Sequence, residues 1–435
     1  NYRWVIIVCF CCLSFSSGMN WMTIASIAAN VQDAYGFSSS FVYLFSVSYA
    51  IMYLVGFPLA VYLLDHKGMV RLGMSISSIC IIVGVGLRLL FNTNIYAALV
   101  GQFICALAQP FCQVSVGKVS SLWFKVENRT LVCSICSLIN NLGTTIGSFF
   151  YKIILSSEVI DKEDYKASIF DYLLAEAILS FILAAPTIFL FRSKPKTHPS
   201  RSQKEHYALK TDFKTSLSLL LHNKDYLLFS LSAALSLSYI TSFGNIFVSY
   251  YSKYNVPFEN MFLLILIPCA ASILTSLLLS YLIDKKKNYK KIFFILLVSA
   301  ITGQTVMLIL TELQVDFLIN NILVVFLVLT SICNSCSVPF YAIGMDYTSE
   351  LTYPVGELIS GGTIMLLTQF ITIGESYLCD YFLSYLDKRY YVQCLNLLSL
   401  IASLVMVFFI SSKLVRNDLD NNKALLEKGV DREKE

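Results

Sequence analysis

A repeated junction between an apolar run and a cluster of charges gives the first sign of the fold. Its first copy reads Leu63-Leu64-Asp65-His66-Lys67-Gly68, and its second reads Leu282-Ile283-Asp284-Lys285-Lys286-Lys287. Asp65 and Asp284 are 219 residues apart, and basic residues follow each of them closely. The repeat therefore predicts that the chain is built from two similar halves.

Long apolar runs precede both junctions and recur along the chain. Hydrophobic residues make up 56% of the 435 residues and charged residues 14%, whereas about 25% of an ordinary soluble domain is charged. A helix needs about 20 mostly apolar residues to cross a bilayer, and transmembrane β-strands would be about 10 residues long with alternating polarity. The sequence predicts an all-α membrane protein with twelve transmembrane helices in two pseudo-symmetric six-helix bundles. The expected spans are 4–27, 41–64, 72–91, 95–119, 131–155, 168–191, 226–250, 261–283, 292–311, 317–345, 358–380 and 392–412.

The basic residues set the expected orientation. With both termini in the cytoplasm, 24 of the 32 Lys and Arg residues fall on the cytoplasmic side and six on the other side, as the positive-inside rule requires. The polar stretch 192–225 then links an N-terminal bundle (1–191) to a C-terminal bundle (226–412), and residues 413–435 form a cytoplasmic tail. The first run is longer than the apolar part of a signal peptide, so we expect a retained span.

Charged residues near the cytoplasmic helix ends are candidates for a gate. They are Asp65, Arg71, Asp284, Arg129, Glu350 and Glu357. The two aspartates can pair with a cation of a neighbouring helix in one conformation and release it in another. The two glutamates belong to an acidic loop without Lys or Arg, opposite a basic loop that contains Arg129. Ordinary surface charge is the alternative interpretation of this set.

Several motifs follow one another from the first span to the eleventh. They are Asn20-Trp21-Met22, Tyr49 with Tyr53, Gly101-Gln102, Ala108-Gln109-Pro110-Phe111, Trp123-Phe124, Asn141-Leu142-Gly143 with Gly147, and Glu350-Leu351-Thr352-Tyr353-Pro354 with Gln369. The segment 65–71 resembles the loop between spans two and three of the major facilitator superfamily. The ordered set resembles one branch of it, the feline leukaemia virus subgroup C receptor family, whose members are linked to choline, ethanolamine and heme transport. The resemblance implies a solute carrier that works by alternating access.

The resemblance also implies a substrate site. In the choline-carrying relatives a Trp of span one, a Tyr of span seven and a Gln in each of spans five and eleven hold the substrate. The matching residues here are Trp21, Tyr239, Asn141 and Gln369. Asn141 departs from this pattern, because its side chain is one methylene shorter than Gln and reaches less far.

The chemistry of these residues suits a small cationic alcohol. Aromatic faces attract a quaternary ammonium group, and an amide can donate to and accept from a hydroxyl. Asn20 beside Trp21 suggests a helix face turned toward a wet cavity, and Tyr49 of the second span joins the candidate substrate-binding residues. Packing of aromatic rings and hydrogen bonds between helices are the alternatives. Gly143 and Gly147 predict close helix packing rather than a ligand contact.

Two charges stand out within the spans. Glu176 lies in the sixth span and Arg88 near the outer end of the third, and a charge inside a span is a functional candidate by default. Glu176 is a candidate proton site, although we expect it to lie near enough to the outer surface to reach water. The sequence places no carboxylate near Trp21, Tyr239, Asn141 or Gln369, which favours facilitated transport over proton coupling.

Other chemistry finds little support in the sequence. The four His residues all fall in expected cytoplasmic segments, which excludes His ligation of heme in a central cavity and leaves Met, Cys or Tyr as heme ligands. Most of the 13 Cys residues lie inside spans, where they pack as small apolar residues. We expect no catalytic site, metal, cofactor or nucleic-acid partner. The alternatives to a choline carrier are a heme or pyridoxine carrier, proton-coupled or not, and a transport-inactive receptor. We expect a monomer in the bilayer, most simply in the plasma membrane.

Overall fold

The computed structural model describes the chain from residue 2 to residue 410. Outside this description lie residues 28–30, 33–34, 67, 125, 155–161, 194–212, 253, 255, 257, 262, 287, 313–315, 353–354, 385, 387 and both ends, together with the side chains of some further helical residues. The described part consists of helices and their connections, without a β-strand. The predicted all-α fold is confirmed.

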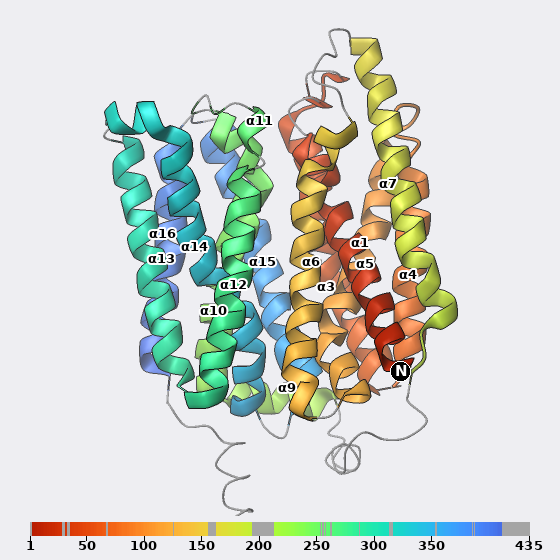
Figure 1. The fold of residues 1–435 in the computed structure, drawn as a ribbon, viewed down its shortest axis with the longest axis vertical. Coiled ribbons are helices and arrows are strands. Elements are labelled where there is room, and N and C mark those ends of the chain that lie inside the picture. Colours follow the sequence, from red (N-terminus) through yellow and green to blue (C-terminus); the bar gives the residue numbers. More distant parts are fainter. Residues whose placement is uncertain are drawn as a thin grey trace, which may run out of the picture.

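The first six apolar runs form one group of helices, coloured red to yellow in Figure 1. Each helix begins and ends within six residues of its predicted span. Unbroken helices are expected in these runs, because in hydrocarbon every backbone polar group has to bond within the segment. The helices are α1 (Tyr2–Ser26), α3 (Ser39–Val61) with the π-helical turn η1 (Tyr62–His66), α4 (Val70–Arg88), α5 (Ile95–Trp123), α6 (Val126–Ile154) and α7 (Lys162–Leu190).

The remaining runs form a second group, coloured green to blue in Figure 1. The helices are α10 (Lys224–Ser252), α11 (Phe258–Met261), α12 (Leu263–Lys286), α13 (Tyr289–Glu312), α14 (Asp316–Leu351), α15 (Glu357–Ser384) and α16 (Arg389–Phe409). The polar stretch that we expected to be a linker also contains a helix, α9 (Phe213–His222), in which Leu220 is buried while Leu219 and Leu221 are exposed.

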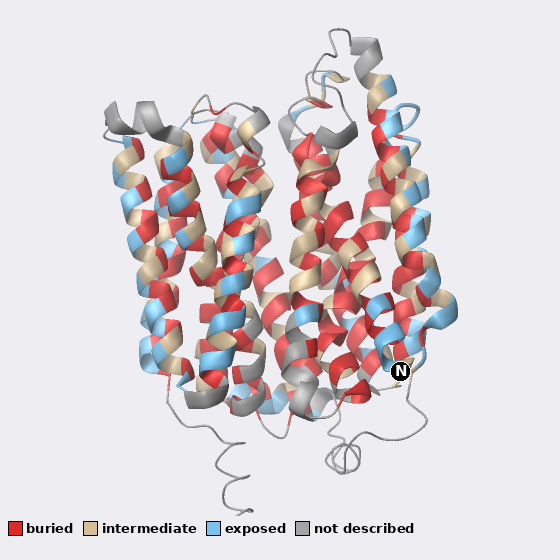
Figure 2. Ribbon diagram, in the orientation of Figure 1, coloured by how far each residue is buried: buried red, intermediate tan, exposed pale blue. Residues whose placement is uncertain are grey.

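Eleven of the described helices are long and apolar enough to cross a membrane. The fifth predicted span forms α6, which is 29 residues long and is not among the eleven. Figure 2 shows exposed residues along the outer helices of both groups. Many large apolar side chains are exposed, among them Phe189 and Phe370. This exposure suits contact with lipid rather than water, so the chain is an integral, multi-pass membrane protein.

Glycines bring α1 and α6 into backbone contact. A Cβ atom added to Gly143 would lie 2.2 Å from the carbonyl O of Phe15, and one added to Gly147 would lie 2.4 Å from that of Met19. Gly18 has the same relation to the carbonyl O of Asn140, at 2.2 Å. The predicted close packing at Gly143 and Gly147 is confirmed, and it fixes the relative position of the helices that carry Trp21 and Asn141.

The two groups of helices touch along their facing sides. Helices α3 and α5 pack against α15, and α6 packs against α12. Gly68 turns the chain between η1 and α4 with a φ of 65°, a conformation that favours glycine. These contacts leave a cavity between the two groups.

Candidate binding cavity

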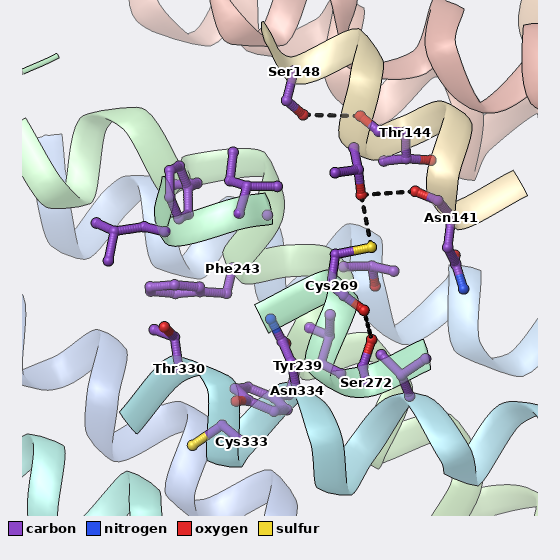
Figure 3. Close-up of a pocket in the computed structure, with 18 of the residues that line it drawn as sticks. Asn141, Thr144, Ser148, Tyr239, Phe243, Cys269, Ser272, Thr330, Cys333 and Asn334 are labelled. Carbon is purple, nitrogen blue, oxygen red and sulfur yellow. Dashed lines mark hydrogen bonds between the residues drawn. The ribbon is translucent and has the colours of Figure 1, made fainter. Parts of the chain in front are cut away.

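A cavity of about 190 Å³ lies between the two groups of helices (Figure 3). Helices α1 and α6 form one wall, and α10, α12, α13, α14 and α16 form the other. The space holds more than a single water molecule. Its walls are mostly apolar with a few converging polar groups, as in sites for small organic molecules.

Trp21 contributes an aromatic face to the first wall. Its indole Nε1 donates a hydrogen bond of 3.1 Å to the carbonyl O of Ser46 on α3. Its ring lies 6.3 Å from that of Tyr49, which is fully buried behind it. Because the indole N–H is bonded within the protein, the ring face is the part of Trp21 that remains to meet a ligand.

Asn141 lies on the same wall, one turn before a contact that joins the two groups. Thr145 Oγ1 lies 2.9 Å from the backbone O of Asn141 and 3.0 Å from Cys269 Sγ on α12 (Figure 3). Thr145 therefore links α6 to α12 at the edge of the cavity. Any movement of one group against the other has to change this contact.

Tyr239, Phe243 and Phe247 of α10 supply aromatic rings to the second wall, which also carries several amides. Gln304 donates to the side-chain carbonyl of Gln393, and Gln393 donates to the hydroxyl of Tyr250. Asn396 lies one turn beyond Gln393, is only 2% exposed, and its Nδ2 has no hydrogen-bond partner among the described residues. Asn396 thus offers the cavity a buried N–H donor.

Sequence reasoning missed the amides of this wall. Gln393 and Asn396 lie three residues apart in an otherwise apolar run, so they share one face of α16. That spacing was the available signal, since paired amides in a span need partners or a ligand.

Three predicted substrate-binding residues lie outside the cavity wall. Gln369 is buried in α15, and Tyr49 lies behind Trp21. Asn20 faces α7, where its Oδ1 accepts a hydrogen bond of 3.1 Å from Ser180 Oγ. The cavity therefore brings together Trp21, Asn141 and Tyr239, and direct contact of the other three with a ligand stays a prediction.

A buried ion pair stands behind Trp21. Arg88 Nη2 lies 2.9 Å from Glu176 Oε2, and Arg88 Nη1 lies 3.0 Å from Glu176 Oε1. Thr23 Oγ1 donates a further hydrogen bond of 2.6 Å to Glu176 Oε1. Our expectation that Glu176 reaches water is wrong, because Arg88 and Thr23 enclose it and its side chain is 1% exposed.

A second buried carboxyl group lies near the backbone of Tyr239 and was not among the predicted site residues. Glu375 on α15 is 8% exposed. Its Oε1 accepts a hydrogen bond of 2.6 Å from Ser399 Oγ, and its Oε2 lies 3.4 Å from Ser242 Oγ. Ser242 Oγ also lies 3.1 Å from the carbonyl O of Tyr239, so the expectation that no carboxylate lies near Tyr239 is wrong. The error arose because Glu375 lies near the end of the expected span 358–380, where a polar residue is not unusual.

The candidate gate residues lie at the helix ends, mostly outside the described side chains. Those of Asp65, Asp284, Arg129, Glu350 and Glu357 are not described. Arg71 is exposed at the start of α4, and its backbone N–H donates to Ser193 Oγ at 3.1 Å. Their pairing stays a prediction. Among the described residues no cluster of His, Cys, Asp or Glu could hold a metal ion.

Comparisons with known proteins agree with the fold and with the family resemblance. The chain is 26% identical over 393 residues to the choline/ethanolamine transporter FLVCR2 of Rattus norvegicus, covering 87% of this chain and 69% of the relative. It is also 26% identical to the Homo sapiens protein of the same name, over 87% of this chain and 72% of the relative. The predicted resemblance is confirmed.

Solved structures show the same architecture. The FucP transporter in its outward conformation aligns with a TM-score of 0.65 at 13% identity, over 94% of this chain and 100% of that chain. The family model described as Major Facilitator Superfamily matches residues 10–351. With eleven described helices long and apolar enough to cross a membrane, a cavity between two helix groups and this match, the chain belongs to the major facilitator superfamily and is a membrane transporter, not an enzyme.

Proposed function

We propose that this transporter carries choline or a related amine alcohol. The observation that supports the proposal most is the meeting of Trp21 and Tyr239, from different helix groups, in one cavity that also contains Asn141 and Asn396. The names of the relatives, choline/ethanolamine transporters, point to the same class of cargo. Because the chain is 26% identical to these relatives, their names support the class of cargo, and experiment has to identify the particular solute.

The chemistry of the cavity matches each part of such a cargo. A desolvated cation–π contact between an ammonium group and a ring is worth about 2 kcal/mol or more. The hydroxyl of the cargo can accept a hydrogen bond from Asn396 Nδ2, which has no partner among the described residues. The membrane potential acts on the cationic cargo with about 2.3 kcal/mol per 100 mV, which suffices for facilitated transport.

Transport then proceeds by alternating access. We propose that the bundles 1–191 and 226–412 rock about the cavity, with 192–225 as the linker between them and 413–435 as a tail. Asp65, Arg71 and Asp284, together with Arg129, Glu350 and Glu357, form and release contacts at the cytoplasmic mouth. The protein acts as a monomer with both termini in the cytoplasm, in the plasma membrane.

Uptake of radiolabelled choline by proteoliposomes that contain the purified protein tests this proposal. We expect saturable uptake, and we expect Trp21→Ala to weaken apparent affinity by about thirtyfold, the equivalent of about 2 kcal/mol. Trp21→Phe keeps a ring face and should retain most of the activity. Phe370→Ala is the matched control, because Phe370 is an aromatic residue that is 67% exposed and does not line the cavity. Uptake no greater than that of empty liposomes would refute the choline proposal.

Competition by other solutes separates the alternatives. Unlabelled ethanolamine should compete with choline, whereas hemin and pyridoxine should not. Preferential uptake of hemin or pyridoxine would make the chain a carrier of that solute. Absence of uptake for all four, with specific binding of a protein partner, would favour a transport-inactive receptor.

A further inference from the structure

We propose that Glu375 is a proton-binding site, and that a cation in the cavity displaces its proton. The carboxyl group is enclosed by α10, α15 and α16, and no Lys, Arg or His among the described residues forms an ion pair with it. Glu176, the carboxyl group that the sequence offered as a proton site, is instead paired with Arg88. Of these two carboxyl groups, Glu375 is therefore the one whose charge is free to change.

Hydroxyl groups take the place of a counter-ion around Glu375. Ser399 Oγ donates to Oε1 at 2.6 Å, and Ser242 Oγ lies 3.4 Å from Oε2. Ser238, one turn before Ser242 on α10, presents a third hydroxyl to the same carboxyl group. Hydroxyls can donate to a carboxylate and can equally accept from a carboxylic acid. The surroundings therefore accommodate both protonation states.

The hydrogen bonds of Ser242 fit the protonated state in this conformation. Ser242 Oγ lies 3.1 Å from the carbonyl O of Tyr239 as well as 3.4 Å from Glu375 Oε2. A hydroxyl has one proton, and here the shorter contact is to the carbonyl. If Glu375 carries a proton on Oε2, it donates to Ser242, and Ser242 donates to Tyr239. Every group in this chain is then satisfied.

The internal repeat shows how the unpaired carboxyl group arises. The spacing of 219 residues that relates Asp65 to Asp284 also relates three residues around the ion pair to three in the second half. These pairs are Thr23 with Ser242, Ser180 with Ser399, and Arg88 with Met307. The second half has kept the two hydroxyls and has Met307 where the first half has its arginine. The carboxyl group of Glu375, on α15, lies against the hydroxyls of Ser242 and Ser399. No arginine among the described residues accompanies it there, because the equivalent of Arg88 is Met307.

The other titratable groups near Glu375 among the described residues carry no positive charge at neutral pH, and one of them, Asp380 of α15, is a second acid. Helix α10 contributes the phenol of Tyr239, with the Cys333 thiol of α14 beside it. Cys379 lies one turn along α15, and Tyr43 of α3 packs next to it. From α16 the facing group is the Ser399 hydroxyl. None of these groups supplies the positive charge that would hold Glu375 ionised.

A cation in the cavity would supply that charge. Tyr239 and Asn396 line the cavity, and each is three residues from a serine that contacts Glu375. At an effective dielectric constant of about 20, two unit charges about 10 Å apart change each other's binding by roughly tenfold. The bound cation favours loss of the proton, and by linkage the ionised carboxylate favours the cation. This cargo-dependent part rests on the function proposed above, whereas the proton site itself does not.

Infrared spectroscopy of the purified protein in lipid nanodiscs tests the proton site without any cargo. At neutral pH we expect a carbonyl stretch typical of a protonated carboxyl group, which is absent in Glu375→Gln. Asp380→Asn is the matched control on the same helix, because Asp380 is partly exposed and accepts a hydrogen bond from Ser384; it should leave the band unchanged. Ser399→Ala removes one hydrogen bond and should shift the band, so the test stands even where Glu375→Gln fails to fold. A spectrum without a band that responds to either position would overturn the proposal.

Choline binding as a function of pH tests the displacement. We expect affinity to rise roughly tenfold between about pH 5 and about pH 9, and we expect Glu375→Gln to bind choline with nearly the same affinity across this range. Wild-type binding that is independent of pH, or a pH dependence that persists unchanged in Glu375→Gln, would overturn it. Absence of choline binding at every pH would instead refute the proposed cargo and the displacement, and the infrared band would still decide whether Glu375 holds a proton.

Discussion

The guanidinium group of Arg88 and the carboxylate of Glu176 form a bidentate ion pair. The distance from Nη2 to Oε2 is 2.9 Å, and the distance from Nη1 to Oε1 is 3.0 Å. The pair joins α4 to α7, and Thr23 ties α1 to the same carboxylate. Because α1 also carries Trp21, the pair fixes the position of one cavity wall. We therefore assign it a structural role.

Removing one partner of this ion pair should lower the free energy of unfolding more than replacing both partners by apolar residues. Glu176→Gln leaves the guanidinium group of Arg88 buried without a counter-ion, and we expect the free energy of unfolding to fall by about 3–5 kcal/mol. The double variant Arg88→Met/Glu176→Leu should recover most of this loss, since apolar replacements of buried pairs are often neutral. Thermal unfolding of the purified proteins measures both effects. A double variant no more stable than the single one would contradict the structural role.

The close contact between α1 and α6 predicts that alanine substitution of Gly143 and of Gly86 will affect protein stability very differently. Gly143→Ala would place a Cβ atom 2.2 Å from the carbonyl O of Phe15, so the helices must separate and stability should fall. Gly86→Ala, in α4, meets no atom within 4 Å, and it should be neutral or stabilising by up to about 1 kcal/mol because Ala favours a helix. The melting temperatures of the two variants give the comparison. Equal effects would show that the close packing does not hold in the protein.

The sequence predicted the helices well for a physical reason. A bilayer imposes a minimum length and a minimum apolarity on each span, so runs such as 95–119 and 292–311 correspond directly to α5 and α13. The family resemblance added Trp21, Asn141 and Tyr239, which the structure brings together at one cavity. Composition alone could not have selected these residues from so many aromatic rings and amides.

The polar groups behind the cavity were harder to predict, because their meaning depends on partners from distant helices. Glu176 looked accessible until Arg88, 88 residues earlier, was found to enclose it. Glu375 has partners 24 and 133 residues away. Gln369 matches a family position but does not line this cavity in the present conformation.

Asn396 should distinguish cargo with a hydroxyl from cargo without one. Asn396→Leu removes the unpaired N–H donor, and we expect choline binding to weaken about tenfold, within the range of one buried hydrogen bond. Tetramethylammonium has no hydroxyl and should bind the variant as well as it binds the wild-type protein, which makes it the matched control. Protein stability should not fall, because Asn396 Nδ2 has no hydrogen bond to lose among the described residues. Equal weakening for both cations would mean that Asn396 shapes the cavity without contacting the hydroxyl.

A covalent tether at the cavity edge should stop transport. Thr145 Oγ1 and Cys269 Sγ lie 3.0 Å apart across the two helix groups, which suits a disulfide between Cβ atoms about 4 Å apart. In Thr145→Cys, oxidation should link α6 to α12 and abolish choline uptake, because the two groups can no longer rock, and a reductant should restore it. Thr144→Cys carries a new thiol on the same helix and should not be inhibited. A Thr145→Cys protein shown by mass spectrometry to be cross-linked, yet transporting at the wild-type rate, would exclude relative movement of α6 and α12 from the transport cycle.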